Sequence, residues 1–274
     1  MTKPVAFITG TSSGFGLLAS IALAGNGYYV VASMRNPEKK KALEEAIHRQ
    51  QIKEIEMVPL DVTKHEEATA TIQEVIKRLG KIDVLVNNAG YAEGGFVEDL
   101  SIEDFRRQFE TNFFGTIAVT KAVLPHMRRQ RTGKIINISS ISGKIGFPAL
   151  SPYVSSKHAL EGFSESLRLE LLPYGVYVSL IEPGSYQTEI WSKGLGKVHT
   201  GESAYEKEMA KIIREVNHIS QSAADPQEVA DLIVQVANTK HPKLRYPVGK
   251  GVESGIFLKH LLPWSWIERR ILQR

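Results

Sequence analysis

The chain has 274 residues, of which 42% are hydrophobic, enough to bury a sizeable core, and we expect one α/β domain over residues 1–274. It has no cysteine, which excludes disulfides, thiolate metal sites and a cysteine nucleophile, and its eight histidines show no metal-ligand spacing, so no metal is expected. The formal charge of +4 is spread along the chain in short basic runs, which does not favour nucleic-acid binding, and no run of ~18 apolar residues predicts a membrane span. We expect a soluble, cytoplasmic protein.

Short apolar runs alternate along the chain with segments of helical length. Runs such as Val84-Leu85-Val86 are continuous, as in parallel strands covered on both faces. They predict a doubly wound, mostly parallel, Rossmann-like sheet of about seven strands with helices on both faces. Helix starts are indicated by Asn36-Pro37 and by Ser101 with Asp104 three residues later. The expected strands are Val5–Thr9, Tyr28–Ser33, Ile55–Pro59, Ile82–Asn87, Lys134–Ser139 and Val176–Ile181.

A glycine-rich turn follows the first predicted strand and opens a helix. The spacing of Gly10, Gly14 and Gly16 is Gly-x-x-x-Gly-x-Gly, which differs from the Gly-x-Gly-x-x-Gly dinucleotide fingerprint. Glycines let the backbone approach a ligand closely, the helix amino terminus offers unpaired N–H groups, and Ser12 and Ser13 add hydroxyl donors. We expect a pyrophosphate to bind here, the alternative being a turn that uses glycine only for φ > 0.

The end of the second predicted strand carries no carboxylate. Dinucleotide enzymes often place an acid there to bind the adenosine ribose, but this region reads Ser33-Met34-Arg35-Asn36. A guanidinium can make charge-assisted hydrogen bonds with a 2′-phosphate, so Arg35 favours NADP(H) over NAD(H). The alternative is an arginine that points into solvent.

Tyr153 and Lys157 stand four residues apart in a segment of helical length, which puts a phenol and an ammonium on one helix face. A free tyrosine ionises near pH ~10, and a neighbouring cation favours the phenolate. The pair predicts a tyrosine acid/base whose pKa is lowered by the lysine. A surface pair at helical spacing is the alternative.

With these features in order, the chain resembles the short-chain dehydrogenase/reductase family, in its classical single-domain form, over nearly its whole length. Phe15 inside the glycine turn and the Met34-Arg35 pair are similar to the branch that contains 17β-hydroxysteroid and retinol dehydrogenases. The matching positions are Thr9, Gly10, Gly14, Gly16, Asp61-Val62, Asn87-Asn88-Ala89-Gly90, Asn112, Ser140, Tyr153, Lys157, and Pro183-Gly184 with Thr188.

The resemblance implies a site for hydride transfer. Tyr153 would exchange a proton with the substrate oxygen, Lys157 would also hold the nicotinamide ribose, and Ser140 would hydrogen-bond the substrate oxygen. Ser139 is the rival serine, and the family spacing before the tyrosine selects Ser140. Asn112 is implied to hold a water that links Lys157 to solvent, with a capping or core asparagine as the alternative.

The remaining matches are implied to bind the cofactor. Asp61 would accept from the adenine amino group with Val62 packed nearby, although an aspartate at a strand end is often only a turn residue. Asn88-Ala89-Gly90 would close the cofactor channel and brace the sheet. Pro183-Gly184 would place backbone against the nicotinamide, with Thr188 reaching its carboxamide or the pyrophosphate.

The residues expected around the substrate are less informative than those of the cofactor site. Residues 189–221 place Trp191 among glycines and charges, a composition typical of a mobile lid, and Phe147 and Leu150 are expected to form apolar walls opposite it. Such a pocket favours a steroid, retinoid or long-chain alcohol or ketone, an interpretation that also rests on the resemblance. The amphipathic tail at 253–274 suits three uses: packing on the substrate cleft, a subunit contact, or weak contact with a membrane surface.

Two functional hypotheses remain open. The first is an NADP(H)-dependent oxidoreductase that interconverts an alcohol and its carbonyl, and the resemblance implies a homodimer or homotetramer. The second is a nucleotide-binding regulatory protein of the same fold without turnover. The intact set of Ser140, Tyr153, Lys157 and Asn112 favours the enzyme, because a protein that only binds nucleotide needs no such set.

Overall fold

Seven strands form the centre of the protein in the computed structural model, which describes residues 3–187, 203–221 and 224–272. Their order is β3-β2-β1-β4-β5-β6-β7, and every neighbouring pair is parallel. This sheet confirms the predicted doubly wound, Rossmann-like fold. The strands are β1 (Val5–Thr9), β2 (Tyr29–Met34), β3 (Ile55–Pro59), β4 (Val84–Asn87), β5 (Gly133–Ile138), β6 (Val176–Pro183) and β7 (Arg245–Val248).

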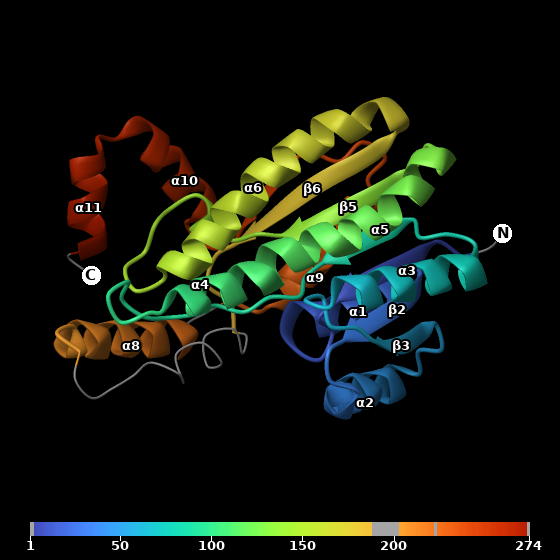
Figure 1. Cartoon of the computed structure of the whole chain (residues 1–274), viewed down its shortest axis with the longest axis horizontal. Coiled ribbons are helices and arrows are strands. Elements are labelled where there is room, and N and C mark those ends of the chain that lie inside the picture. The colour runs from blue at the N-terminus through green and yellow to red at the C-terminus, as the bar shows by residue number, and fades with distance from the viewer. Residues whose placement is uncertain (1–2, 188–202, 222–223, 273–274) are drawn as a thin grey trace.

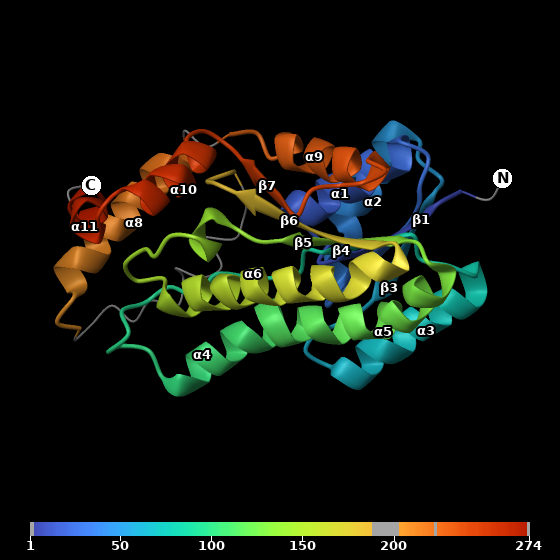
Figure 2. The ribbon, with the colours of Figure 1, turned by 90° about the horizontal axis from the view of Figure 1, so that it is seen from above.

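Helices cover both faces of the sheet. One face carries α1 (Gly14–Gly25), α2 (Lys41–Gln50) and α9 (Gln227–Asn238), as Figure 2 shows. The other carries α3 (His65–Leu79), α4 (Ile102–Phe109), α5 (Gly115–Gln130) and α6 (Ser151–Leu171). At the end towards which the strands run lie α8 (Glu206–Gln221), α10 (Val252–Leu261) and α11 (Trp264–Leu272) (Figure 1). Among the described residues, no helix has the length and apolar character needed to cross a lipid bilayer.

Strand β1 is buried along its whole length, because both of its faces are covered. Successive side chains of a strand point to opposite faces. Accordingly, Ala6 and Ile8 enter the apolar cluster under α1 and α9, whereas Val5 and Phe7 enter the cluster under α3 and α5. The continuous apolar runs of the sequence are therefore those of strands in the middle of a three-layer fold.

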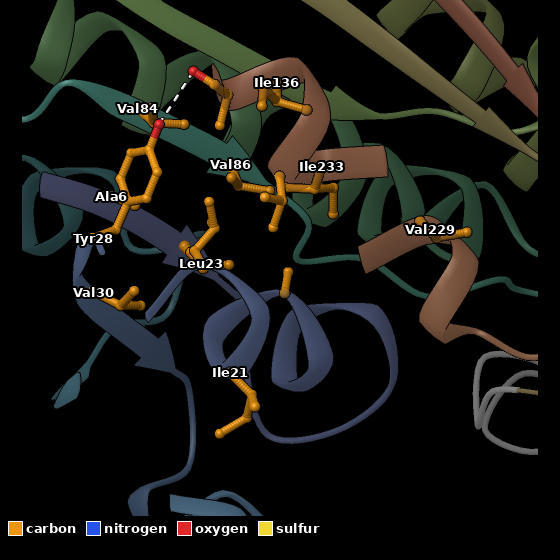
Figure 3. Close-up of a cluster of buried hydrophobic side chains, with 14 of the residues drawn as sticks. Ala6, Ile21, Leu23, Tyr28, Val30, Val84, Val86, Ile136, Val229 and Ile233 are labelled. Carbon is orange, nitrogen blue, oxygen red and sulfur yellow. Dashed lines mark hydrogen bonds between the residues drawn. The ribbon is translucent and has the colours of Figure 1, made fainter. Parts of the chain in front are cut away.

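The cluster under α1 and α9 joins distant parts of the chain. Figure 3 shows Leu23 of α1, Val30 of β2 and Ile233 of α9 in it. At its edge, the Tyr28 hydroxyl donates to the Ala237 carbonyl oxygen at 3.1 Å. This bond satisfies a buried hydroxyl and ties the start of β2 to the end of α9.

Four of the six predicted strands have boundaries that differ from the structure by one or two residues. Strand β2 covers Tyr29–Met34, β4 starts at Val84, β5 covers Gly133–Ile138, and β6 continues to Pro183. Strand β7 lies outside the predicted set. Its sequence is short and contains Pro247, which is tolerated because β7 forms one edge of the sheet.

Both predicted helix starts are confirmed. The Asn36 side chain accepts from the Glu38 N–H at 2.9 Å and opens a 3₁₀ helix, Pro37–Lys40. Ser101 and Asp104 form a reciprocal capping box at the start of α4. Helix α4 then continues through a π-turn, Glu110–Phe114, into α5. Such turns often occur at functional sites, and this one contains Asn112.

The strand order reverses between β1 and β4, whose carboxyl ends lie side by side at the same end of the parallel sheet. In open α/β sheets, ligands bind outside the carboxyl ends of the strands at such a point. The glycine turn leaves β1 here, and Asn88 follows β4. The fold therefore brings together two of the predicted motifs.

Candidate active site

A cleft of about 730 Å³ opens at the carboxyl ends of the strands. No group of three or more His, Asp or Glu side chains in the described ranges is placed to hold a metal ion. The cleft brings together most of the predicted site. Of the predicted residues, those that line it are Gly10, Ser12, Ser13, Gly14, Phe15, Arg35, Asp61, Val62, Asn88, Ala89, Gly90, Ser140, Tyr153, Lys157, Pro183 and Gly184.

The glycine turn is held against the end of β4. The Asn88 side chain donates to the carbonyl oxygens of Thr9 and Gly10, both at 2.9 Å. A Cβ atom at Gly16 would lie 2.4 Å from the Asn88 amide nitrogen and 2.4 Å from the Gly10 carbonyl oxygen, so only glycine fits. Gly10 and Gly14 have φ angles of 71° and 57°, a left-handed conformation that favours glycine. The turn thus presents backbone to the cleft at the amino terminus of α1, which suits a pyrophosphate.

Two cations line the cleft beyond the end of β2. Arg35 and Lys39 both border it, and no carboxylate of residues 35–39 does. Lys39 is a residue that the sequence interpretation missed, although it follows Arg35 by four positions. Asp61, after β3, also borders the cleft, and its Oδ1 accepts from the Thr63 N–H at 3.0 Å and hydroxyl at 2.8 Å. That aspartate therefore holds the turn after β3 as well as facing the cleft.

Tyr153 and Lys157 project from the first two turns of α6 and are 4% and 6% exposed. The Lys157 ammonium nitrogen lies 5.7 Å from the centre of the Tyr153 ring. It donates to the Ile138 carbonyl oxygen at 2.7 Å. The lysine is thus anchored to the end of β5 and lies beside the tyrosine.

The two neighbouring serines after β5 point to different partners. Ser140 forms a hydrogen bond with the Tyr153 side chain, and its Oγ accepts from the Ser142 N–H at 3.1 Å. The Ser139 hydroxyl instead donates to Glu161 at 2.6 Å. The structure therefore places Ser140, and not Ser139, beside the tyrosine.

Burial controls the protonation of this pair. It raises the pKa of Tyr153 to about 12, although the hydrogen bond with Ser140 acts to lower it. Burial also lowers the pKa of Lys157 to about 8, while the negative charge of Glu161 acts to raise it. These values correct the expectation that the pKa of Tyr153 lies below that of a free tyrosine. In this structure the effect of burial on the Tyr153 pKa outweighs any lowering by the nearby ammonium. The Lys157 ammonium donates its hydrogen bond to the Ile138 carbonyl oxygen.

Asn112 is 1% exposed and lies outside the cleft lining. Its side chain accepts from the Tyr91 N–H at 3.1 Å and donates to the Tyr91 carbonyl oxygen at 3.0 Å. It also donates to the Ser156 hydroxyl at 3.3 Å. These bonds fix the loop after β4 against α6, and the implied role in holding a water stays a prediction.

Several predicted positions lie elsewhere. Gly16 packs behind the glycine turn, while Phe147 and Leu150 lie in the loop before α6 and do not line the cleft. Thr188 and Trp191 lie outside the described residues. The expected lid at 189–221 is described only from residue 203, where most of it is helix α8.

Sequence interpretation also missed three large residues that line the cleft, Tyr91, Arg107 and Tyr186. The Tyr186 ring meets Phe15 edge to face, with ring centres 5.6 Å apart and planes at 78°, which joins the glycine turn to the loop after β6. Tyr91 directly follows the motif that ends at Gly90, and Tyr186 follows Pro183-Gly184 by two positions, so proximity to a motif could have found them. Arg107 lies on α4 and gives no such signal.

Outside the cleft lining, segments that are distant in the sequence also pack together. Tyr205, just before α8, stacks on Phe96 with ring centres 4.3 Å apart and planes at 11°. Lys259 of α10 donates to the Lys144 carbonyl oxygen, so α10 packs on the loop after β5. Further out, large apolar side chains of α10 and α11 are exposed: Phe257, Leu258, Leu261, Trp264, Trp266 and Leu272.

Comparison with known proteins agrees with this geometry. The family model of the short-chain dehydrogenases matches residues 4–196. The oxidoreductase YusZ of Bacillus subtilis is 52% identical over 97% of this chain and 96% of its own length. Retinol dehydrogenase 8 of Bos taurus is 39% identical over 87% of this chain and 79% of its own length. A solved structure of ElxO with NADP bound is 31% identical and has a TM-score of 0.75, covering 92% of this chain and 100% of that chain.

Proposed function

The chain belongs to the short-chain dehydrogenase family, and on that premise we propose that it is an NADP(H)-dependent oxidoreductase that interconverts a hydrophobic alcohol and its ketone or aldehyde. One observation carries the proposal: Ser140, Tyr153 and Lys157 line the same cleft as the glycine turn. A regulatory protein that only binds nucleotide needs no buried, hydrogen-bonded pair of hydroxyl groups there.

The cleft fits a nicotinamide dinucleotide on the evidence of its own residues. Gly10 and Gly14 line the cleft in a left-handed backbone conformation that favours glycine, so the turn can bring backbone N–H groups close to a pyrophosphate. Pro183 and Gly184 would lie along the nicotinamide. When bound, the dinucleotide supplies or accepts a hydride at the substrate carbon.

Tyr153 would handle the proton at the substrate oxygen. Because its pKa is about 12, the hydroxyl is protonated at pH 7 and can give its proton to a carbonyl oxygen during reduction. Ser140 would donate to the same oxygen as negative charge develops on it, and a charged Lys157 stabilises the phenolate that remains. Alcohol oxidation starts from the phenolate, so we expect oxidation to speed up as pH rises.

The preference for NADP(H) rests on the two cations beyond β2 and is supported by the NADP-bound relative. Arg35→Ala and Lys39→Ala should each raise KM for NADPH about tenfold, because each removes a charged contact with the 2′-phosphate, and should barely change KM for NADH. Lys40→Ala is the matched control, since Lys40 lies outside the cleft lining and pairs with Glu44 at 2.9 Å. Equal changes for both cofactors would rule out this assignment.

A hydrophobic substrate is proposed from the resemblance to retinol dehydrogenase 8 and from the exposed apolar side chains of α10 and α11, helices that lie at the end towards which the strands run. The test is NADPH consumption against steroids, retinoids, long-chain ketones and quinones, with short polar ketones as the comparison. We expect the bulky apolar compounds to have the higher kcat/KM. Turnover of short polar ketones alone would contradict this substrate class.

We also propose a cytoplasmic homodimer or homotetramer. Phe114, Leu169 and Leu172 are exposed on the π-turn and at the end of α6, which suits a subunit contact. Light scattering of the purified protein measures the mass, and a monomer at micromolar concentration would contradict the assembly.

For the tail we propose weak contact with a membrane surface. Trp264 and Trp266 are 52% and 63% exposed, Arg269 is also exposed, and tryptophan and arginine suit the headgroup region. Replacing both tryptophans with serine should reduce co-sedimentation with phosphatidylglycerol vesicles. A change of oligomer mass instead would assign this face to a subunit contact.

A further inference from the structure

A buried ionic cluster lies next to Lys157 and Ser139, and the proposed reaction does not use it. It consists of Lys144 in the loop after β5, Glu161 on α6, Glu182 on β6 and Arg245 on β7. Glu161 is 4% exposed and Glu182 is 1% exposed. A carboxylate so deeply buried is tolerated only when cations and hydrogen-bond donors compensate for the lost water.

Glu161 receives most of that compensation. The Lys144 ammonium nitrogen lies 2.5 Å and Arg245 Nε lies 3.0 Å from Glu161 Oε2. The Ser139 hydroxyl donates to Glu161 Oε1 at 2.6 Å. Two cations and one hydroxyl thus hold this carboxylate on both of its oxygens.

Glu182 is held less well by the same cations. Its Oε1 lies 3.2 Å from Arg245 Nε and 3.6 Å from the Lys144 ammonium nitrogen, without hydrogen-bond geometry to either. Burial, and then the charge of Glu161, raise the pKa of Glu182 to about 7, although Lys144 and Arg245 act to lower it. The shorter contacts therefore assign the lasting negative charge of the pair to Glu161.

Glu161 is also placed to act on the active-site cleft. It follows Lys157 by one helical turn on α6, and its charge opposes the burial that lowers the pKa of that lysine. Its partner Ser139 directly precedes Ser140. Gly143, in the segment after Ser140, packs closely on Ser139 and Glu161. A Cβ atom at Gly143 would lie 2.9 Å from Ser139 Oγ and 3.0 Å from Glu161 Cγ.

From these contacts we propose that Glu161 is a positioning residue, which fixes the Ser139-Ser140 turn and supplies the negative charge that keeps Lys157 an ammonium. The inference rests on the proposed function and adds to it a residue that does not touch the substrate. The charged or titratable groups in contact with Lys157, with Glu161 or with their partners are Tyr153 and Glu165 on α6, Lys144 after β5, Glu182 on β6, Arg245 on β7 and Lys259 on α10.

Glu161→Gln tests the charge, because glutamine keeps an oxygen that can accept from Ser139. In protein labelled with ¹⁵N-lysine, NMR titration should show the Lys157 pKa fall by about one unit, with Lys157→Met identifying the signal. The alkaline limb of the pH profile of kcat/KM for carbonyl reduction should move to lower pH by the same amount. A purely structural role would lower kcat at every pH and leave the limb in place. The NMR titration needs no turnover, so failure of the proposed function would be recognised separately.

Two matched variants complete the test. Glu182→Gln removes the second buried carboxylate, which is not among the causes of the Lys157 pKa shift, and Glu165→Gln removes the half-exposed partner of Arg245, which lies 2.7 Å away. Neither should displace the Lys157 titration measurably. A titration of Glu161→Gln that superimposes on wild type, or equal shifts in all three variants, would overturn the proposal.

Glu161→Asp separates the two parts of the role. It keeps the charge but withdraws the carboxylate from Ser139, so kcat should fall while the alkaline limb stays in place. This variant also keeps the proposal testable if Glu161→Gln does not fold. A limb displaced in Glu161→Asp, or a kcat equal to that of wild type, would contradict the positioning role.

Discussion

The cofactor side of the cleft and the region where the segment before α8 meets Phe96 are built in different ways. On the cofactor side, the ends of neighbouring strands are joined by hydrogen bonds, as when the Asn88 side chain after β4 donates to the carbonyl oxygens of Thr9, the last residue of β1, and Gly10. Outside the cleft lining, single ring contacts join segments that are distant in sequence, as when Tyr205 stacks on Phe96. The parallel sheet itself therefore imposes the geometry of the cofactor side, whereas the outer region depends on a few separate contacts.

Gly16→Ala should have the largest effect on cofactor binding and should disrupt the cofactor side of the cleft. Its new Cβ would lie 2.4 Å from the Asn88 side chain, so the turn must move away from β4. We expect the Kd for NADPH, measured by fluorescence titration, to rise by about 100-fold, and the free energy of unfolding to fall by about 1 to 3 kcal/mol.

Gly25→Ala is the matched control in the same helix, because nothing lies within 4 Å of a Cβ atom there. Alanine at this position should leave NADPH binding intact and change the free energy of unfolding by less than about 1 kcal/mol. If the two variants bind NADPH alike, the close approach at Gly16 does not control the site.

Glu182→Gln should have the next largest effect, which is a change in how the free energy of unfolding depends on pH. The pKa of Glu182 is raised from 4.5 to about 7, so the folded protein holds this proton more tightly than the unfolded chain does. The stability linked to the proton is complete below pH ~4.5 and is lost as pH rises through ~7. Relative to wild type, the variant should therefore gain about 3 kcal/mol in free energy of unfolding between pH 4.5 and 8, measured by urea denaturation. A difference that stays constant over this range would contradict the raised pKa.

Tyr205→Ala should have the smallest effect, because it acts on the contact between the segment before α8 and Phe96, outside the cleft lining. Loss of the stack on Phe96 should raise KM for the best bulky ketone about threefold, because such ring pairs contribute about 0.5 to 1.5 kcal/mol. KM for NADPH should not change. Tyr205→Phe keeps the stack and loses only the hydrogen bond to Glu98, so it should behave as wild type. An equal rise for both variants would assign the effect to the hydroxyl.

The same contrast explains which features could be predicted from the sequence. Continuous apolar runs predicted six strands because parallel strands are buried on both faces. Strand β7 was not predicted, because it is short and contains Pro247, a residue that is tolerated mainly at a sheet edge. Tyr153 and Lys157 could be paired because helical spacing is local. The direction of the Tyr153 pKa shift could not, because burial depends on the whole fold and here outweighs nearby charge. The proximity of Glu161 and Glu182 could not be predicted either, because it depends on how α6 packs against β6.

The most direct test of the central claim, that Tyr153 moves a proton at a site of hydride transfer, is Tyr153→Phe with two readouts. The substitution keeps the ring and removes the hydroxyl that hydrogen-bonds Ser140. We predict that kcat for NADPH-dependent carbonyl reduction falls at least about 10³-fold, while Kd for NADPH stays within about twofold. Turnover close to that of wild type, or a joint loss of binding and turnover, would contradict this role for Tyr153.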